Sequence, residues 1–246
     1  MKKQLAFLAF VAVVGTASLA AGADDKAAAK DNTPPKGFTA LFNGKDVTNW
    51  QALAPMRDAA YAKWVKLSPD ERAEVQKKAN DELLKHWFVE DGVIVHDGTG
   101  TSLQTSKDYG DFELYVDWKI GPKGDSGIYL RAQPQVQIWD SETLGDNLKE
   151  DKGKGSGGLW NNPKGSKGKQ PLKNADKPVG EWNTFHIIMK GENVTVILNG
   201  EKVVDDAPLA NYWEKGKPLP AKGPIELQHH GDKLWFKNIY IKELKD

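Results

Sequence analysis

Residues Asp125–Asp140 have the sequence DSGIYLRAQPQVQIWD, and their pattern predicts the kind of fold that this chain adopts. Apolar and polar residues alternate on both sides of the AQP tripeptide at 132–134, which predicts two short strands joined by a turn. Side chains along a strand point alternately to its two faces. The face turned toward a core carries Ile128, Leu130, Val136 and Ile138. The opposite face carries Tyr129, Arg131, Gln135, Gln137 and Trp139.

This second face differs from an ordinary solvated surface. Tryptophan offers a flat apolar platform, whereas arginine and glutamine offer hydrogen-bond donors and acceptors at fixed positions. The combination suits a polyhydroxylated ligand such as a sugar. The alternative is a solvent-facing sheet with incidental aromatic residues, and the pattern alone does not separate the two.

Composition narrows the class of protein. The 246 residues suffice for one large all-β domain or two small ones. The 34 basic and 34 acidic residues balance, so nothing indicates electrostatic binding to nucleic acid or to a membrane surface. Nine Trp and 24 Gly favour a turn-rich protein over a helical bundle. The absence of Cys excludes both disulfides and a lipoprotein anchor.

The first residues predict an exported protein. Lys2 and Lys3 precede the apolar run Leu5–Val14, and small residues follow up to Ala23. This is the pattern of a cleavable signal peptide over residues 1–23, with Ala20 as the alternative cleavage point. Residues 24–36 read as a disordered linker. We therefore expect a periplasmic or secreted protein that is soluble after cleavage.

Residues 37–246 form the predicted domain, and most of it has strand patterns. Phe112–Ile120 alternates strictly, and Asp91-Gly92 and Asn199-Gly200 are typical of tight hairpin turns. Many short strands with frequent turns predict an all-β fold, a two-sheet antiparallel jelly-roll sandwich. Between them, residues 144–179 form a long Gly- and Lys-rich loop around Trp160. Long loops in compact domains are often functional, so Trp160 is a candidate ligand contact.

One helical insertion interrupts the strands at residues 55–87. Ser68-Pro69-Asp70-Glu71 is a capping box with proline at the first helical position. A shorter helix is expected at Asp58–Leu67. Packing against the outside of a sheet is the favoured role, and a lid over the site is the alternative.

A second segment, Pro224–Gly231, carries side chains that suit chemistry. If its aliphatic residues face the core, Glu226, Gln228 and His230 share the other face and can join the polar face of Asp125–Asp140. Glu226 and His230 are then candidate acids or bases, and Arg131 a fixed cation. The alternatives are an ion pair between Glu226 and Arg131 and a turn-capping role for His230.

Two further candidates concern Asp140 and a metal. Asp140 ends its strand and is a candidate catalytic residue, although aspartate there commonly bonds the turn backbone. No HExxH, phosphate loop or G-x-S-x-G is present. The adjacent His229 and His230 point to opposite faces of a strand, which argues against a classical zinc site. One divalent metal held by His230 and carboxylates stays open as an alternative.

Several segments together resemble the 3-keto-disaccharide hydrolase family, long known as a domain of unknown function. They occur in order over residues 37–244: FTALFNGKDVTNW, VEDGVIV, GDFELYVDWKI, DSGIYLRAQPQVQIWD, GEWNTFHIIMKGENVTVILNG and GPIELQHHGDKLWFKNIYIKEL. The chain departs from the family pattern at Asp125, Gln135 and His229, where an Asn, an acidic residue and an Asp are expected.

The resemblance implies a concanavalin-like jelly roll and an exported enzyme. It also implies action on glycosides oxidised at C3 by a partner enzyme, a sugar 3-dehydrogenase. A ketone at C3 acidifies the C2 proton, so that a weak base removes it, the C1 group leaves and water adds back. We expect Glu226 or His230 as the base and Arg131 as the group that stabilises the enolate.

Two other functions remain open from the sequence. A conventional glycoside hydrolase would use two carboxylates, but the E-x-D-x-x-E pattern of laminarinase-type jelly rolls is missing. A non-catalytic carbohydrate-binding module would use the same fold, because fold does not fix function. In each case we expect the substrate contacts to come from Tyr129, Gln135, Gln137, Trp139, Trp160 and Gln228.

Overall fold

A computed structural model describes residues 30–53, 66–133, 135–143 and 152–245. The predicted signal peptide and residues 24–29 of the predicted linker lie outside these ranges. Within them the chain forms two antiparallel sheets and one helix, α2 (Pro69–Leu83), which confirms the predicted all-β jelly-roll sandwich. None of the described helical residues forms a segment long and apolar enough to cross a bilayer.

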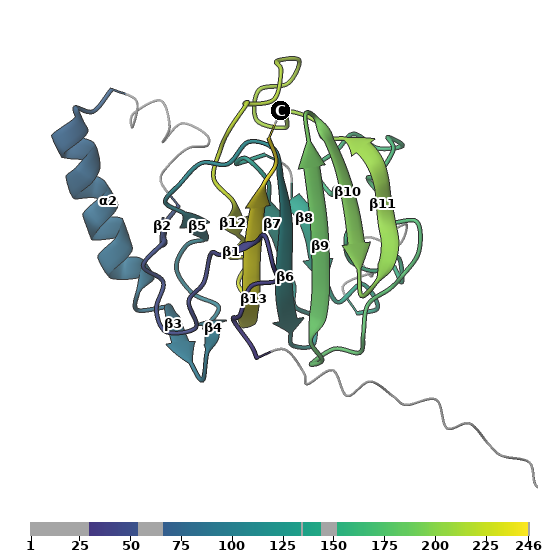
Figure 1. The fold of residues 1–246 in the computed structure, drawn as a ribbon, viewed down its shortest axis with the longest axis horizontal. Coiled ribbons are helices and arrows are strands. Elements are labelled where there is room, and N and C mark those ends of the chain that lie inside the picture. The colour runs from purple at the N-terminus through teal and green to yellow at the C-terminus, as the bar shows by residue number, and fades with distance from the viewer. Residues whose placement is uncertain (1–29, 54–65, 134, 144–151, 246) are drawn as a thin grey trace, which may run out of the picture.

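The larger sheet holds the long strands (Figure 1). Its order is β11 (Glu201–Pro208), β10 (Asn193–Leu198), β9 (Asn183–Lys190), β6 (Phe112–Ile120), β13 (Leu234–Glu243), β4 (Val93–His96) and β3 (Trp87–Glu90), and β1 (Thr39–Ala40) also pairs with β13. The smaller sheet has the order β2 (Trp50–Ala52), β5 (Leu103–Thr105), β12 (Glu226–Leu227), β7 (Asp125–Tyr129) and β8 (Gln135–Trp139).

Local sequence explains the long strands and their turns. Buried and half-buried residues alternate along all of β6, as its period of two predicts. At the β3–β4 and β10–β11 turns, Asp91-Gly92 and Asn199-Gly200 all have positive φ. Asparagine, aspartate and glycine tolerate this conformation best, and it matches the twist of the flanking strands.

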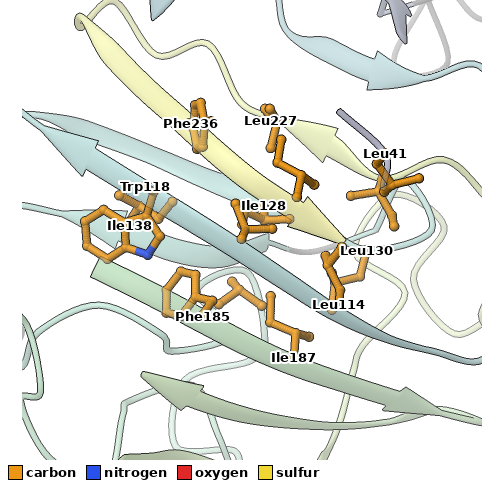
Figure 2. Close-up of a cluster of buried hydrophobic side chains, with 14 of the residues drawn as sticks. Leu41, Leu114, Trp118, Ile128, Leu130, Ile138, Phe185, Ile187, Leu227 and Phe236 are labelled. Carbon is orange, nitrogen blue, oxygen red and sulfur yellow. The ribbon is translucent and has the colours of Figure 1, made fainter. Parts of the chain in front are cut away.

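The core lies between the two sheets (Figure 2). The larger sheet contributes side chains such as Leu114, Phe185 and Phe236, all fully buried. From the smaller sheet come Ile128, Ile138 and Leu227, also fully buried. The aliphatic face of β7 and β8 therefore packs in the core, as predicted, and their other face points away from the larger sheet.

Helix α2 begins at the predicted capping box, with Ser68 and Glu71 bonded reciprocally. It packs at the edge strand β2: Asn80 accepts the backbone N–H of Ala52 at 2.8 Å, and Gln76 donates to the Ala52 carbonyl at 2.9 Å. These bonds occupy backbone groups that an open sheet edge would expose. The favoured packing role is thus what α2 performs. The shorter helix expected at Asp58–Leu67 falls almost wholly outside the described residues.

Candidate functional site

The polar face of the smaller sheet brings the two predicted segments together. Tyr129 lies opposite Gln135 on one side and Glu226 on the other, and Glu226 lies opposite Gln104 of β5. Directly opposed residues share a face. One row of side chains therefore runs across four strands: Gln104, Glu226, Tyr129 and Gln135. The prediction that Pro224–Gly231 lies beside the hairpin is confirmed.

This row is buried. Glu226 is 1% exposed, and Gln104, Tyr129 and Gln135 are each under 5% exposed. The side-chain carbonyls of Gln104, Gln135 and Gln228 find no hydrogen-bond partner among the described residues. Buried acceptors without donors are unusual in folded proteins. A ligand rich in hydroxyl groups would supply the missing donors.

A chain of hydrogen bonds runs along the face from this row. Gln135 donates to Gln137 at 2.9 Å, and Gln137 donates to Asp125 at 2.7 Å. Asp125 Oδ2 lies 3.6 Å from His230 Nδ1. The hydrogen bonds therefore end at Asp125, which is largely enclosed and faces the His230 imidazole across an ion-pair distance. The His230 side chain is 55% exposed, so it is open to a ligand.

Burial raises the pKa of Asp125, and the nearby His230 opposes that shift. An enclosed carboxylate beside an accessible imidazole can orient the ring and stabilise its protonated form, which is the usual arrangement of a histidine base. Sequence reasoning did not include Asp125 among the candidate site residues. The signal was present, because the alternation that places Tyr129 on the polar face also places Gly127 and Asp125 there.

The predicted location of Arg131 is wrong. Arg131 and Ala132 both have positive φ, so β7 ends at Tyr129 and its alternation stops. The guanidinium lies at the end of the sandwich where β6 begins. There it pairs with Asp111 and donates to the carbonyls of Gly110 and Gly191. The alternative pairing with Glu226 is also wrong. Arg131 anchors the hairpin tip and is absent from the polar face.

Asp140 has the structural role considered as its alternative. Its carboxylate accepts the backbone N–H of Lys123 at 2.9 Å and bonds the hydroxyl and N–H of Thr143. Burial opposes ionisation of Asp140, but these hydrogen bonds outweigh it and lower its pKa. An aspartate so occupied holds a turn.

The two predicted tryptophan contacts lie against each other. Trp139 is 4% exposed, donates from Nε1 to the Gly155 carbonyl at 2.8 Å and packs on Trp160 with ring centroids 5.1 Å apart. Lys169 lies over the Trp160 ring at 4.1 Å. Both residues join the predicted region, but Trp139 is an enclosed wall and offers no open stacking surface.

An aromatic pair that sequence reasoning missed lies beside Tyr129 of this row. Trp213 stacks beside Tyr129 with ring centroids 6.5 Å apart and meets Tyr212 edge-on at 4.8 Å. Its Nε1 donates to the Ala132 carbonyl at 2.8 Å, which fixes the ring. Trp213 and Tyr212 are each 38% exposed. No periodicity marks them, because they belong to a loop.

The histidines do not form a metal cluster. Within the described ranges, no three His, Asp or Glu side chains gather as ligands of an ion. His229 points away from His230, and its ring lies 5.0 Å from that of the fully buried His96. Burial lowers the pKa of both His96 and His229, which favours neutral rings.

The fold and this face define a jelly-roll protein whose smaller sheet carries an enclosed polar and aromatic face. Residues 37–242 match the family described as 3-keto-alpha-glucoside-1,2-lyase-like domain. The chain belongs to that family, which confirms the resemblance inferred from sequence motifs.

Individual relatives agree with this assignment. A 3-keto-disaccharide hydrolase of Bacteroides thetaiotaomicron is 26% identical over 85% of this chain and 79% of its own length. A crystal structure of a candidate glycosyl hydrolase from Parabacteroides distasonis superposes on this chain with a TM-score of 0.62. The two sequences are 28% identical, and the alignment covers 88% of this chain and 100% of the other. A second structure of that description and organism has a TM-score of 0.57, with 26% identity over 85% of each chain. Together they support a glycoside-hydrolase-like enzyme.

Proposed function

We propose that the protein cleaves the glycosidic bond of 3-keto-glycosides and 3-keto-disaccharides by removing the C2 proton. The observation that carries the proposal is the Asp125–His230 pair, which shares one face with the buried carboxyl of Glu226. The family and the named relatives supply the substrate class.

The reaction balances as an elimination followed by a hydration. A base takes the proton from C2, and the electron pair forms a C2–C3 enolate with its charge on the C3 oxygen. The enolate collapses to a C1–C2 double bond and expels the C1 oxygen, which takes a proton from an acid. Water then adds to C1 and a proton returns to C2, so the net change is hydrolysis.

His230 is the better placed base, because its ring is accessible and Asp125 can stabilise the charge that it gains. Glu226 lies opposite Tyr129, at the far end of β7 from Asp125. The four-residue step from Asp125 to Tyr129 along β7 corresponds to about 13 Å. The side chains of His230 and Glu226, one at each end of that step, can reach the same sugar ring. Glu226 then serves as the acid at the leaving oxygen.

With Arg131 anchored elsewhere, the enolate needs another donor. Gln228 lies between Glu226 and His230 in sequence and donates to the Tyr129 hydroxyl at 3.4 Å, a long bond that a ligand can replace. We assign the Gln228 amide to the C3 oxygen.

The test incubates the purified protein with 3-keto-trehalose and 3-keto-glucosides beside the unoxidised sugars. The proposal expects cleavage of the keto forms alone. Cleavage of the unoxidised sugars would indicate a two-carboxylate glycoside hydrolase, and binding without cleavage would indicate a carbohydrate-binding module. The same assay after dialysis against a chelator, with divalent ions then restored, decides whether a metal takes part.

Export and a partner enzyme belong to the same proposal. A signal peptide over residues 1–23 would deliver the enzyme to the periplasm or medium, and a sugar 3-dehydrogenase would supply its oxidised substrates. Sequencing the N-terminus of the protein recovered from those fractions checks the first point, with Asp24 as the expected first residue for cleavage after Ala23.

A further inference from the structure

A cavity of about 280 Å³ lies at the end of the sandwich, where β6 and β8 finish and β9 begins. Trp118 and Ile120 of β6 line one side, and Asp140 lines another. Residues 174–181, just before β9, complete the wall. Trp139 also lines the cavity, so the cavity adjoins the polar face at the end of β8. Glu226, His230 and Tyr129 are not among its described lining residues.

Trp118 brings an unused donor to this cavity. The residue is 1% exposed and belongs to the hydrophobic core (Figure 2). Its indole Nε1 is buried, and no described residue accepts its hydrogen bond. Buried tryptophan N–H groups usually find an acceptor, and leaving one unmade is costly.

Asp176 brings an unused acceptor. Its Oδ2 accepts the backbone N–H of Ser156 at 2.8 Å, whereas its buried Oδ1 has no hydrogen-bond partner in the described part of the chain. Two other polar side chains of the wall are already occupied. Asn183 accepts the N–H of Lys177 at 2.8 Å, and Ser141 accepts that of Gly155 at 3.0 Å.

An N–H donor and a carboxylate acceptor together match hydroxyl groups, which accept from one and donate to the other. The indole of Trp118 and the apolar Pro178 and Val179 suit the C–H face of a small ring. The volume lies just below the usual range of about 300–1,000 Å³ for drug-sized ligands, so one ring fits better than two.

We propose that this end cavity is a second ligand site, which binds one polyhydroxylated molecule of monosaccharide size. None of the residues given a step in the proposed reaction, Asp125, Glu226, Gln228 and His230, is among the described lining residues, and Trp139 is the one predicted substrate contact that the cavity shares.

The experiment is a nuclear magnetic resonance titration of the full chain with glucose, following the assigned indole N–H signal of Trp118. The signal should shift with saturation. Asp176→Asn retains an acceptor for Ser156 and should weaken binding at least about tenfold, because a charge-assisted hydrogen bond is lost. Thermal unfolding establishes that this variant is folded.

Two controls locate the effect. Asp205→Asn changes an exposed aspartate that pairs with Lys202 at 2.7 Å, and should bind glucose as the wild type does. His230→Gln alters the polar face and should leave the Trp118 shift unchanged. An unmoved Trp118 signal up to the solubility limit, as expected for ordered water only, would overturn the proposal, and so would equal binding by the Asp176 and Asp205 variants.

Discussion

At His230 the imidazole is open to solvent on one side and faces a largely enclosed carboxylate on the other, 3.6 Å away. Gln137 holds Asp125, and Gln135 holds Gln137. A base needs access to its proton and a fixed orientation, and this chain of amides supplies the second requirement. The neutral amide of Gln135 suits this hydrogen-bond chain, because its N–H donates to Gln137 while its carbonyl oxygen stays available to accept from a ligand.

His230→Gln should lower turnover of a 3-keto-disaccharide at least about a hundredfold, the low end for general base catalysis. The Michaelis constant should change little, since glutamine fills similar space. Steady-state kinetics on the purified variant measure both parameters.

The matched control is His186→Gln on the outer face of the larger sheet, where His186 pairs with Glu113 at 3.2 Å. This control should keep full activity. Unchanged turnover in His230→Gln would remove His230 from the mechanism.

At the level of elements, the β7–β8 hairpin is fixed at its tip by Arg131. This side chain is 4% exposed, and its ion pair with Asp111 compensates for the water that the buried guanidinium has lost. Arg131→Met should reduce the free energy of unfolding by about 3 kcal/mol, because it leaves the Asp111 carboxylate without its cation and the carbonyls of Gly110 and Gly191 without their side-chain donor. Turnover per folded molecule should stay within about twofold.

Denaturant unfolding measures the stability, and assays at low temperature measure the turnover. Lys107→Met, which breaks an exposed ion pair with Glu243, is the control and should cost about 1 kcal/mol or less. A hundredfold loss of turnover with normal stability in Arg131→Met would return Arg131 to the site.

The loop that carries Trp213 is the second element of the site. Its ring is fixed by the Ala132 carbonyl and lies beside Tyr129, which suits it as a platform for a sugar ring. Trp213→Ala should raise the Michaelis constant about tenfold, or about 1.4 kcal/mol, with a smaller change in turnover.

Phe88→Ala, which removes another exposed aromatic residue from β3, should leave both kinetic parameters unchanged. An unaltered Michaelis constant in Trp213→Ala would show that the platform lies elsewhere.

The strands explain why so much of the fold could be predicted and part of the site could not. A period of two survives along β6 and along β7 from Asp125 to Tyr129, so the core face and most of the polar face follow from the sequence. The period fails where backbone angles change sign, at Arg131. Trp213 could not be predicted, because its position depends on a loop folding back over residues far away in sequence.

For the whole molecule, the free energy of unfolding should depend on the solution pH through the ionisation of Asp176. Burial raises the pKa of Asp176 to about 6. Below its ordinary value of 3.8 the carboxyl is protonated in both folded and unfolded states and costs nothing. As the pH rises toward the folded pKa, the unfolded state ionises first, and the folded state loses stability until about pH 6.

Asp176→Asn removes this penalty. The variant should gain up to about 3 kcal/mol of stability above neutral pH and nothing at low pH, because a shift of one unit corresponds to about 1.4 kcal/mol. Urea unfolding of both proteins across the pH range measures the difference. A gain that is the same at every pH would contradict the assignment.

Cleavage of 3-keto-trehalose in D₂O tests whether the enzyme removes the C2 proton. Nuclear magnetic resonance of the released 3-keto sugar reads the isotope at C2, with substrate alone and His230→Gln as controls for spontaneous exchange. The proposed mechanism predicts deuterium at C2 of the released 3-keto sugar formed by the wild type. Efficient cleavage with hydrogen retained at C2 would contradict it.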